Sequence, residues 1–141
     1  MATRDDMSVV KRDTVALQTE SDVVRARQTV RSWAQDIGFT IVDTTKLVTA
    51  ASELARNTFD HGGGGEMQLE LHDQGDRRGL RLVFVDHGPG IADIDLAMRD
   101  GFTTGKGMGM GLGGSRRLVN EFEFESQLAV GTRVAITRWR T

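Results

Sequence analysis

The sequence of 141 residues contains no cysteine and one proline, and none of its apolar runs approaches the length of a membrane span. Without cysteine there can be no disulfide, no thiolate zinc site and no thiol nucleophile. A membrane-spanning helix needs about 20 apolar residues. The N-terminal stretch MATRDDMSVVKRD also lacks the apolar segment of a signal peptide. We therefore expect a soluble, cytoplasmic protein that does not enter a membrane.

Neither positive nor negative charge is in large excess. The 18 basic and 20 acidic residues give a formal net charge of -2, so nonspecific attraction to nucleic acid is not expected. The length suits one domain with a single core. Because the first residues are highly charged, as in a frayed terminus, we expect a flexible extension at residues 1–12 and one domain at residues 13–141.

Hydrophobic periodicity predicts alternating blocks of strands and helices. The first helix is expected to be capped by Ser21 or Asp22, and the second to begin near Asp43 or Thr44. Blocks in this order favour the α+β class: a two-layer α/β sandwich whose mixed, mostly antiparallel sheet carries helices on one face. We predict strands at residues 14–18, 67–72, 80–85, 121–127 and 133–139, and helices at residues 21–38, 43–62, 91–100 and 111–120.

Glu53 and Asn57 are four residues apart in a predicted helix, so both side chains would lie on one face. An ionised carboxylate can accept the proton of an attacking hydroxyl. An amide oxygen is a hard ligand of the kind that Mg²⁺ shares with nucleotide phosphates. The alternative is a capping or surface pair on an ordinary amphipathic helix.

Asp86 falls at a predicted strand end, in the sequence DHGPG. Its carboxylate could accept a hydrogen bond from the exocyclic amine of adenine, a group that guanine replaces with a carbonyl. Gly88 and Gly90 would let the backbone approach the purine, and Pro89 would fix the turn between them. The alternative is a simple turn.

A third segment is rich in glycine and leads into a predicted helix, an arrangement that favours bound phosphate. It matches neither the Walker A loop nor the dinucleotide fingerprint. A flexible linker is the alternative. Lys106, Arg116 or Arg117 could reach a phosphate, although exposed basic side chains are usually solvated. The glycines are Gly105, Gly107, Gly109, Gly111, Gly113 and Gly114.

Together these segments resemble the N, G1 and G2 boxes of the GHKL superfamily of ATPases and kinases, whose fold is the Bergerat α/β sandwich. The chain is most similar to the small serine/threonine switch kinases of anti-sigma and stressosome pathways, the RsbT type. The resemblance spans residues 13–140. It is carried by SELARN at residues 52–57, DHGPGI at 86–91, DGFTT at 100–104, GMGL at 109–112 and the Gly131-Thr132 pair.

The resemblance implies ATP and Mg²⁺ as cofactors. It implies Glu53 as catalytic base, Asn57 as metal and nucleotide ligand, Asp86 as adenine ligand and Thr132 behind the adenine. The remaining nucleotide contacts that it implies are Gly88, Gly90, Ile91 and an ATP lid made of Gly105, Lys106, Gly107, Met108, Gly109, Met110, Gly111, Leu112 and Gly113.

The resemblance also implies partners. The substrate would be a serine or threonine of a small STAS-domain protein of the RsbS type, in a complex with RsbR-like proteins. Phosphorylation would free the kinase to activate an RsbU-like phosphatase, and related switch kinases bind sigma factors directly. Two other functions stay open: a nucleotide-gated, anti-sigma-type binding module with little turnover, and a detached histidine-kinase catalytic domain.

Two features depart from the family pattern. The segment Asp60-His61 followed by four glycines at residues 62–65 is expected to be a more polar and flexible exit from the second helix than is usual. Lys106 stands where the lid often has a small residue. His61 and His87 have no further histidine or cysteine at ligand spacing, so we expect supporting roles for them in loops.

Overall fold

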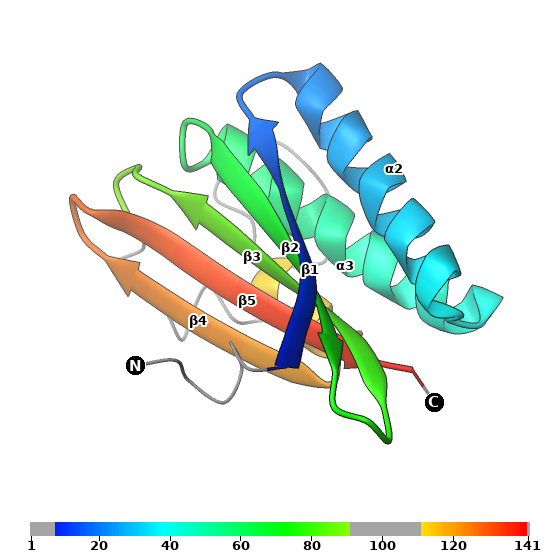
Figure 1. Cartoon of the computed structure of the whole chain (residues 1–141). Coiled ribbons are helices and arrows are strands. Elements are labelled where there is room, and N and C mark those ends of the chain that lie inside the picture. Colours follow the sequence, from blue (N-terminus) through cyan, green and yellow to red (C-terminus); the bar gives the residue numbers. More distant parts are fainter. Residues whose placement is uncertain (1–7, 91–110, 141) are drawn as a thin grey trace.

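The chain folds into a five-stranded sheet with helices on one face (Figure 1). The structure is a computed structural model that describes residues 8–90 and 111–140. All strand pairings are antiparallel, in the order β1-β2-β3-β5-β4, which confirms the predicted α+β two-layer sandwich. The elements are β1 Val9–Leu17, α2 Glu20–Ile37, α3 Ile41–Asp60, β2 Gly65–Asp73, β3 Arg78–Asp86, α5 Gly111–Arg116, β4 Glu121–Gln127 and β5 Gly131–Trp139.

Both long helices begin earlier than predicted, because threonines cap them. The Thr19 side chain accepts a hydrogen bond from the Asp22 backbone N–H, and Asp22 bonds back to the Thr19 N–H, which is a capping box. Thr40 caps α3 by accepting from the Asp43 N–H. Asp22 is therefore the third residue of α2. The backbone N–H of Gln18 is the main reason that its pKa is lowered.

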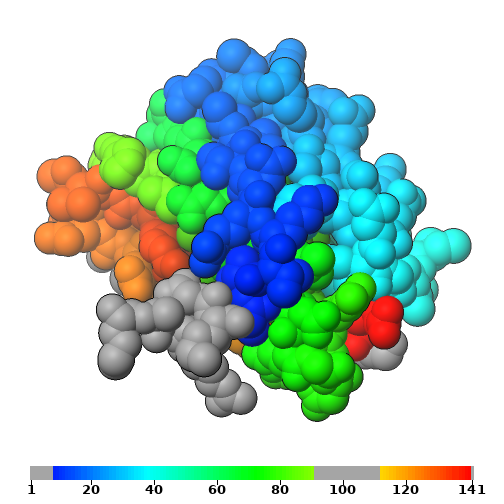
Figure 2. Space-filling model, viewed as in Figure 1, coloured from blue at the N-terminus to red at the C-terminus, as the bar shows by residue number. Residues whose placement is uncertain are grey.

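The first strand is also longer than predicted. β1 begins at Val9, and residues 9–12 belong to the sheet rather than to a flexible extension. Pairing with β2 orders them: Arg12 lies opposite Glu70, with 3.7 Å between the charged groups, and the Lys11 ammonium lies 4.2 Å from the Trp33 ring centre. Figure 2 shows β1 exposed along the edge of the sheet, next to α2. Residues 1–7 lie outside the described residues.

Near the C-terminus, the predicted helix at residues 111–120 ends early, at Arg116. The chain then turns, with hydrogen bonds from the Arg117 N–H to the Gly114 carbonyl and from the Leu118 N–H to the Ser115 carbonyl. Asn120 instead accepts a hydrogen bond from the Trp139 backbone N–H. The predicted helix at residues 91–100 lies outside the described residues.

The core lies between the sheet and the two long helices. The α3 side that faces the sheet is fully buried, and side chains from alternate positions of β2, β3 and β5 meet it. The main contributors are Leu47, Ala51, Leu54, Met67, Leu69, Leu80, Leu82, Phe84, Val134 and Ile136.

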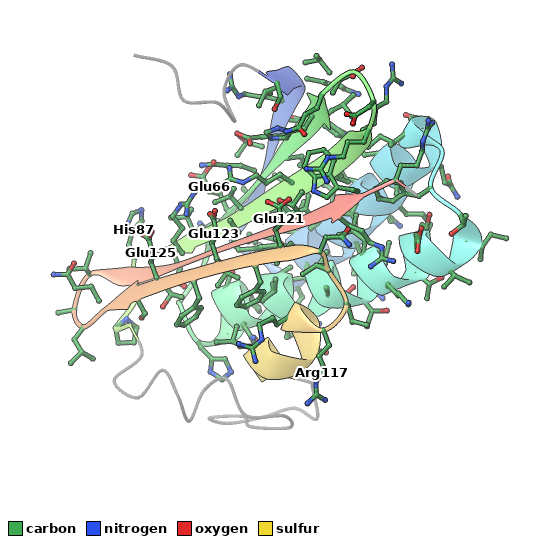
Figure 3. The ribbon with its side chains drawn as sticks, turned by 90° about the horizontal axis from the view of Figure 1, so that it is seen from below. Glu66, His87, Arg117, Glu121, Glu123 and Glu125 are labelled. Carbon is green, nitrogen blue, oxygen red and sulfur yellow. The ribbon has the colours of Figure 1, made fainter. Side chains whose placement is uncertain are left out.

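A chain of ion pairs crosses the opposite face of the sheet. Arg81 on β3 donates to Glu70 on β2 at 3.1 Å and to Glu123 on β4 at 3.2 Å. Glu121, Glu123 and Glu125 project from β4 on this side (Figure 3). Burial alone would raise the pKa of Glu70, but hydrogen bonds from His72 and Arg81 hold that pKa below its usual value. Arg81 thus connects acidic side chains of β2 and β4 across this face.

We expect Glu70→Gln to lower the melting temperature at neutral pH more than in acid. Because folding lowers the pKa of Glu70, its contribution to stability is present above the pKa of the unfolded carboxyl and is lost as pH falls through the folded value. Melting curves of both proteins from neutral pH to about pH 3 test this. A difference in melting temperature that stays constant over this range would contradict it.

A buried ion pair ties the start of α3 to β5. The Arg138 guanidinium lies 2.5 Å from the Asp43 carboxylate, and each side chain is 11% exposed. Arg138 also donates to the Leu118 carbonyl at 2.8 Å. The pair thus links the first turn of α3 to β5 and to the turn after α5.

Asp43→Asn should lower the free energy of unfolding by about 3–5 kcal/mol, because it leaves the Arg138 charge buried without its counter-charge. Denaturant unfolding measures the change. The double variant Asp43→Asn/Arg138→Met is the control and should recover part of the loss, since no unpaired charge remains. Equal stability of Asp43→Asn and the wild type would show that the ion pair does not stabilise the link between α3 and β5.

Candidate functional site

Glu53 and Asn57 lie one turn apart in the second half of α3. Both are half-buried, while their neighbours Leu54, Ala55 and Thr58 are buried against the core. Among the described residues, neither the Glu53 carboxylate nor the Asn57 amide forms a hydrogen bond or an ion pair. The two polar groups are therefore held by the packing of the helix and remain available to a ligand.

Asp86 ends β3 and is 8% exposed. Its Oδ1 accepts hydrogen bonds from the backbone N–H groups of Gly88, at 2.9 Å, and Thr132, at 3.3 Å. Thr132 lies directly opposite on β5, and its hydroxyl is 3.0 Å from that of Ser126. The structure thus brings Asp86 and Thr132 together, although 46 residues separate them in the sequence.

Three glycines let the backbone pack around Asp86. A Cβ on Gly131 would overlap the Asp86 carbonyl oxygen. A Cβ on Gly62 would lie 2.5 Å from Asp86 Oδ2, and one on Gly88 would lie 2.6 Å from the Gly62 carbonyl oxygen. A side chain at any of these positions would force its neighbours to shift, which favours glycine at all three.

The glycine run after α3 is therefore closely packed at three of its four positions, Gly62, Gly64 and Gly65. Gly62 lies against Asp86, and a Cβ on Gly65 would overlap the Val85 carbonyl oxygen. These contacts could not be predicted from the sequence, because a run of glycines predicts a loop but does not indicate which segments pack against it. The available signal was the place of the run: it joins α3 to β2, and β2 pairs with β3, which ends in Asp86.

The segment after Asp86 rests on the β4–β5 turn. The Ala129 N–H donates to the Pro89 carbonyl at 2.9 Å. Gly90 has φ 76°, and a Cβ on it would overlap the Gln127 carbonyl oxygen. The β4–β5 hairpin thus fixes the backbone of Pro89 and Gly90.

The histidines take the places expected of them in loops. His61 follows α3, and its backbone N–H donates to the Asn57 carbonyl at 2.9 Å. His87 is exposed just beyond β3 (Figure 3). Within residues 8–90 and 111–140, no three histidine, cysteine or acidic side chains group as metal ligands.

The C-terminal part of the predicted lid is helical and packs on α3. Gly111 begins α5, Leu112 and Gly113 are buried, and Leu112 joins the core. Arg116 and Arg117 are exposed, and Figure 3 shows Arg117 pointing away from the sheet. The other predicted nucleotide contacts, Ile91 and residues 105–110 with Lys106 among them, lie outside the described residues.

The arrangement places a carboxylate and an amide on one helix, whose exit packs against a buried strand-end carboxylate that accepts hydrogen bonds from backbone. Residues 16–138 match the model of the histidine kinase-like ATPase domain. The chain belongs to this family. Its membership confirms the predicted GHKL-type fold and implies that the domain binds ATP.

Two relatives of the chain carry the names of a serine/threonine-protein kinase and of an anti-sigma factor. The chain is 42% identical to the serine/threonine-protein kinase RsbT of Bacillus subtilis over 125 residues, which cover 89% of this chain and 94% of that protein. It is 31% identical to an anti-sigma F factor of Thermoanaerobacter sp. over 120 residues, 81% of this chain and 82% of that protein. The resemblance to RsbT-type kinases read from the motifs is thereby confirmed.

Solved structures agree on the fold. The RsbU and RsbW domains of Rv1364c from Mycobacterium tuberculosis match with a TM-score of 0.65 at 20% identity, over 94% of this chain and 34% of that one. The mycobacterial sensor histidine kinase MprB matches with a TM-score of 0.53 at 22% identity, over 92% of this chain and 99% of that one. In the part of the chain that the structure describes, no helix is long and apolar enough to cross a membrane.

Proposed function

We propose that this domain is an ATP-dependent protein serine/threonine kinase that phosphorylates a small STAS-domain antagonist of the RsbS type. The observation that carries the proposal is the Glu53 carboxylate, which no described residue engages, one turn from Asn57 on α3. Nucleotide binding alone requires no such base. Identity of 42% to a serine/threonine-protein kinase over nearly its whole length supports the same activity.

Asp86 would select adenine. Oδ1 is occupied by two backbone N–H groups, so Oδ2 is the oxygen with capacity to accept a further hydrogen bond. A carboxylate oxygen in that position pairs with the exocyclic amine of adenine and opposes the carbonyl of guanine. Gly88, Gly90 and Thr132 would line the same end of the site.

Asn57 would hold Mg²⁺ through its side-chain oxygen. A single amide oxygen suits this ion, which usually takes one or two protein ligands and completes its shell with phosphates and water. When bound, Mg²⁺ neutralises charge on the phosphates of ATP. The fit rests on the Asn57 amide, which no described residue engages.

Glu53 would act as the base. As the oxygen of the acceptor serine or threonine bonds to the γ-phosphorus, the bond to the β,γ-bridging oxygen breaks, ADP leaves, and the hydroxyl proton passes to Glu53. Leu112 and Gly113 lie in the first turn of α5, which packs on α3. The lid residues that precede them, Gly105 to Met110, would cover the phosphates.

The partners follow from the proposed activity. The acceptor would be a serine or threonine on the STAS-domain protein, held with RsbR-like proteins in a cytoplasmic stressosome complex. Phosphorylation of that protein would release the kinase to activate an RsbU-like phosphatase. The domain would thus work as a partner switch in a stress or sigma-factor pathway.

A second candidate is a nucleotide-gated binding module that captures a sigma factor with little turnover. The observation that favours it is the 31% identity to anti-sigma F factors over 120 residues. A detached histidine-kinase catalytic domain is distinguished by the product, since it would leave phosphate on histidine rather than on serine or threonine.

Glu53→Gln should reduce phosphoryl transfer by roughly 10²–10⁴-fold while ATP binding is retained, because the substitution removes only the proton acceptor. The purified protein is incubated with γ-labelled ATP, Mg²⁺ and candidate STAS-domain proteins, beside the variant. Label on serine or threonine that depends on Glu53 supports the kinase. Tight ATP binding with no label on any partner favours the binding module, and equal loss of labelling and partner capture would refute the base assignment.

Asp86→Asn should reverse the nucleotide preference. The backbone N–H groups of Gly88 and Thr132 would hold the amide oxygen, so the NH₂ group would replace Oδ2 and repel the adenine amine. We expect ATP affinity to fall about tenfold or more and inosine triphosphate to bind at least as well as ATP. Competition binding of the two nucleotides measures this. An unchanged preference would exclude Asp86 as the adenine ligand.

A further inference from the structure

Gly62 stands at the contact between the end of α3 and the carboxylate of Asp86. Its backbone is not in the left-handed region, so alanine would be allowed there by conformation. The obstacle is space: a Cβ would lie 2.5 Å from both Cβ and Oδ2 of Asp86 and even closer to Cγ. Gly62 is thus restricted to glycine by the Asp86 side chain itself.

The contact is two-sided. The Gly62 carbonyl and Cα also lie against Gly88, where a Cβ would approach them to 2.6 and 2.8 Å. On the helix side, the Gly62 N–H donates to the Asn57 carbonyl at 3.3 Å. One residue therefore touches the helix that carries Asn57, the Asp86 carboxylate and the loop that begins at Gly88.

The oxygen that a side chain at position 62 would crowd is Oδ2. Oδ1 is fixed by the backbone N–H groups of Gly88 and Thr132. A methyl group at position 62 would have to rotate or push the carboxylate, and Oδ2 would move most because it is not held by those two bonds. The hydrogen bond that Oδ2 can offer to a base amine is the interaction that would be lost.

We infer that Gly62 is a positioning residue that sets the orientation of the Asp86 carboxylate and thereby the preference for adenine. This inference rests on the proposed function, since it assigns to Asp86 the recognition of the base. Gly62 itself contacts no nucleotide in this proposal. Its effect on the preference for adenine passes through the Asp86 carboxylate.

The test is binding of ATP and inosine triphosphate to Gly62→Ala, with the wild type and Gly63→Ala alongside. Gly63 is the matched control: it has φ 74°, and a Cβ there would meet no atom within 4 Å, so its substitution strains the same loop without touching Asp86. We expect Gly62→Ala to lose about tenfold or more in ATP affinity and little in inosine triphosphate affinity, because one charge-assisted hydrogen bond is removed. Gly63→Ala should keep the wild-type ratio of the two affinities.

An unchanged ratio in Gly62→Ala, or an equal loss for both nucleotides, would overturn the inference, because a merely structural role lowers both. Asp86→Asn distinguishes a failure of the adenine assignment from a failure of the role of Gly62. If Asp86→Asn leaves the ratio unchanged, the adenine assignment fails. If Asp86→Asn changes the ratio and Gly62→Ala does not, only the role of Gly62 fails.

Thermal melting covers the case in which Gly62→Ala is too unstable to assay. Because the crowding involves the carboxyl group, Gly62→Ala should lower the melting temperature less in an Asp86→Ala background than in the wild type. The same loss in both backgrounds would show that the glycine is needed for a reason unrelated to the carboxylate, and would overturn the inference.

Discussion

The close approach of three backbone segments at the end of β3 is the constraint on which the site depends. The exit of α3, the loop after Asp86 and the start of β5 meet there with no room for side chains at Gly62, Gly88 or Gly131. Since protein interiors are close-packed, such contacts transmit small displacements. The exit of α3 therefore lies directly against the side chain of the strand-end carboxylate, and backbone at Gly88 and Gly131 closes the other sides.

Helix α3 is held at both ends. The Asp43–Arg138 ion pair ties its first turn to β5, and Gly62 ties its exit to β3 and the following loop. Between these anchors, its buried side packs on the sheet. Glu53 and Asn57 lie near the exit, on the half of the helix closest to Asp86. A rigid helix fixed in this way keeps the proposed base and the proposed metal ligand in place without using their own polar groups for support.

Strong periodicity predicted the two long helices and all five strands, because each buries one regular face. The predicted helix boundaries were wrong because Thr19 and Thr40, which lie outside the periodic stretches, cap the helices. The predicted start of β1 was wrong because pairing with a distant strand orders charged residues, as when Arg12 lies opposite Glu70. The motifs predicted a site shared by α3 and the end of β3, and of its predicted members the structure brings Asp86 and Thr132 together. They did not predict the packing of Gly62, because that contact joins residues that are distant in the sequence and leaves no pattern along it.

Asp86 and Glu53 differ in how far they support the fold. The Asp86 carboxylate holds the loop at Gly88 and the strand at Thr132 through two accepted hydrogen bonds. A substitution of Asp86 would therefore disturb the contact between these segments as well as the proposed recognition of adenine. Glu53 supports nothing among the described residues. A base that plays no part in holding the fold together can be altered without loss of the fold or of nucleotide binding. Loss of the proposed base would therefore cost the domain little stability.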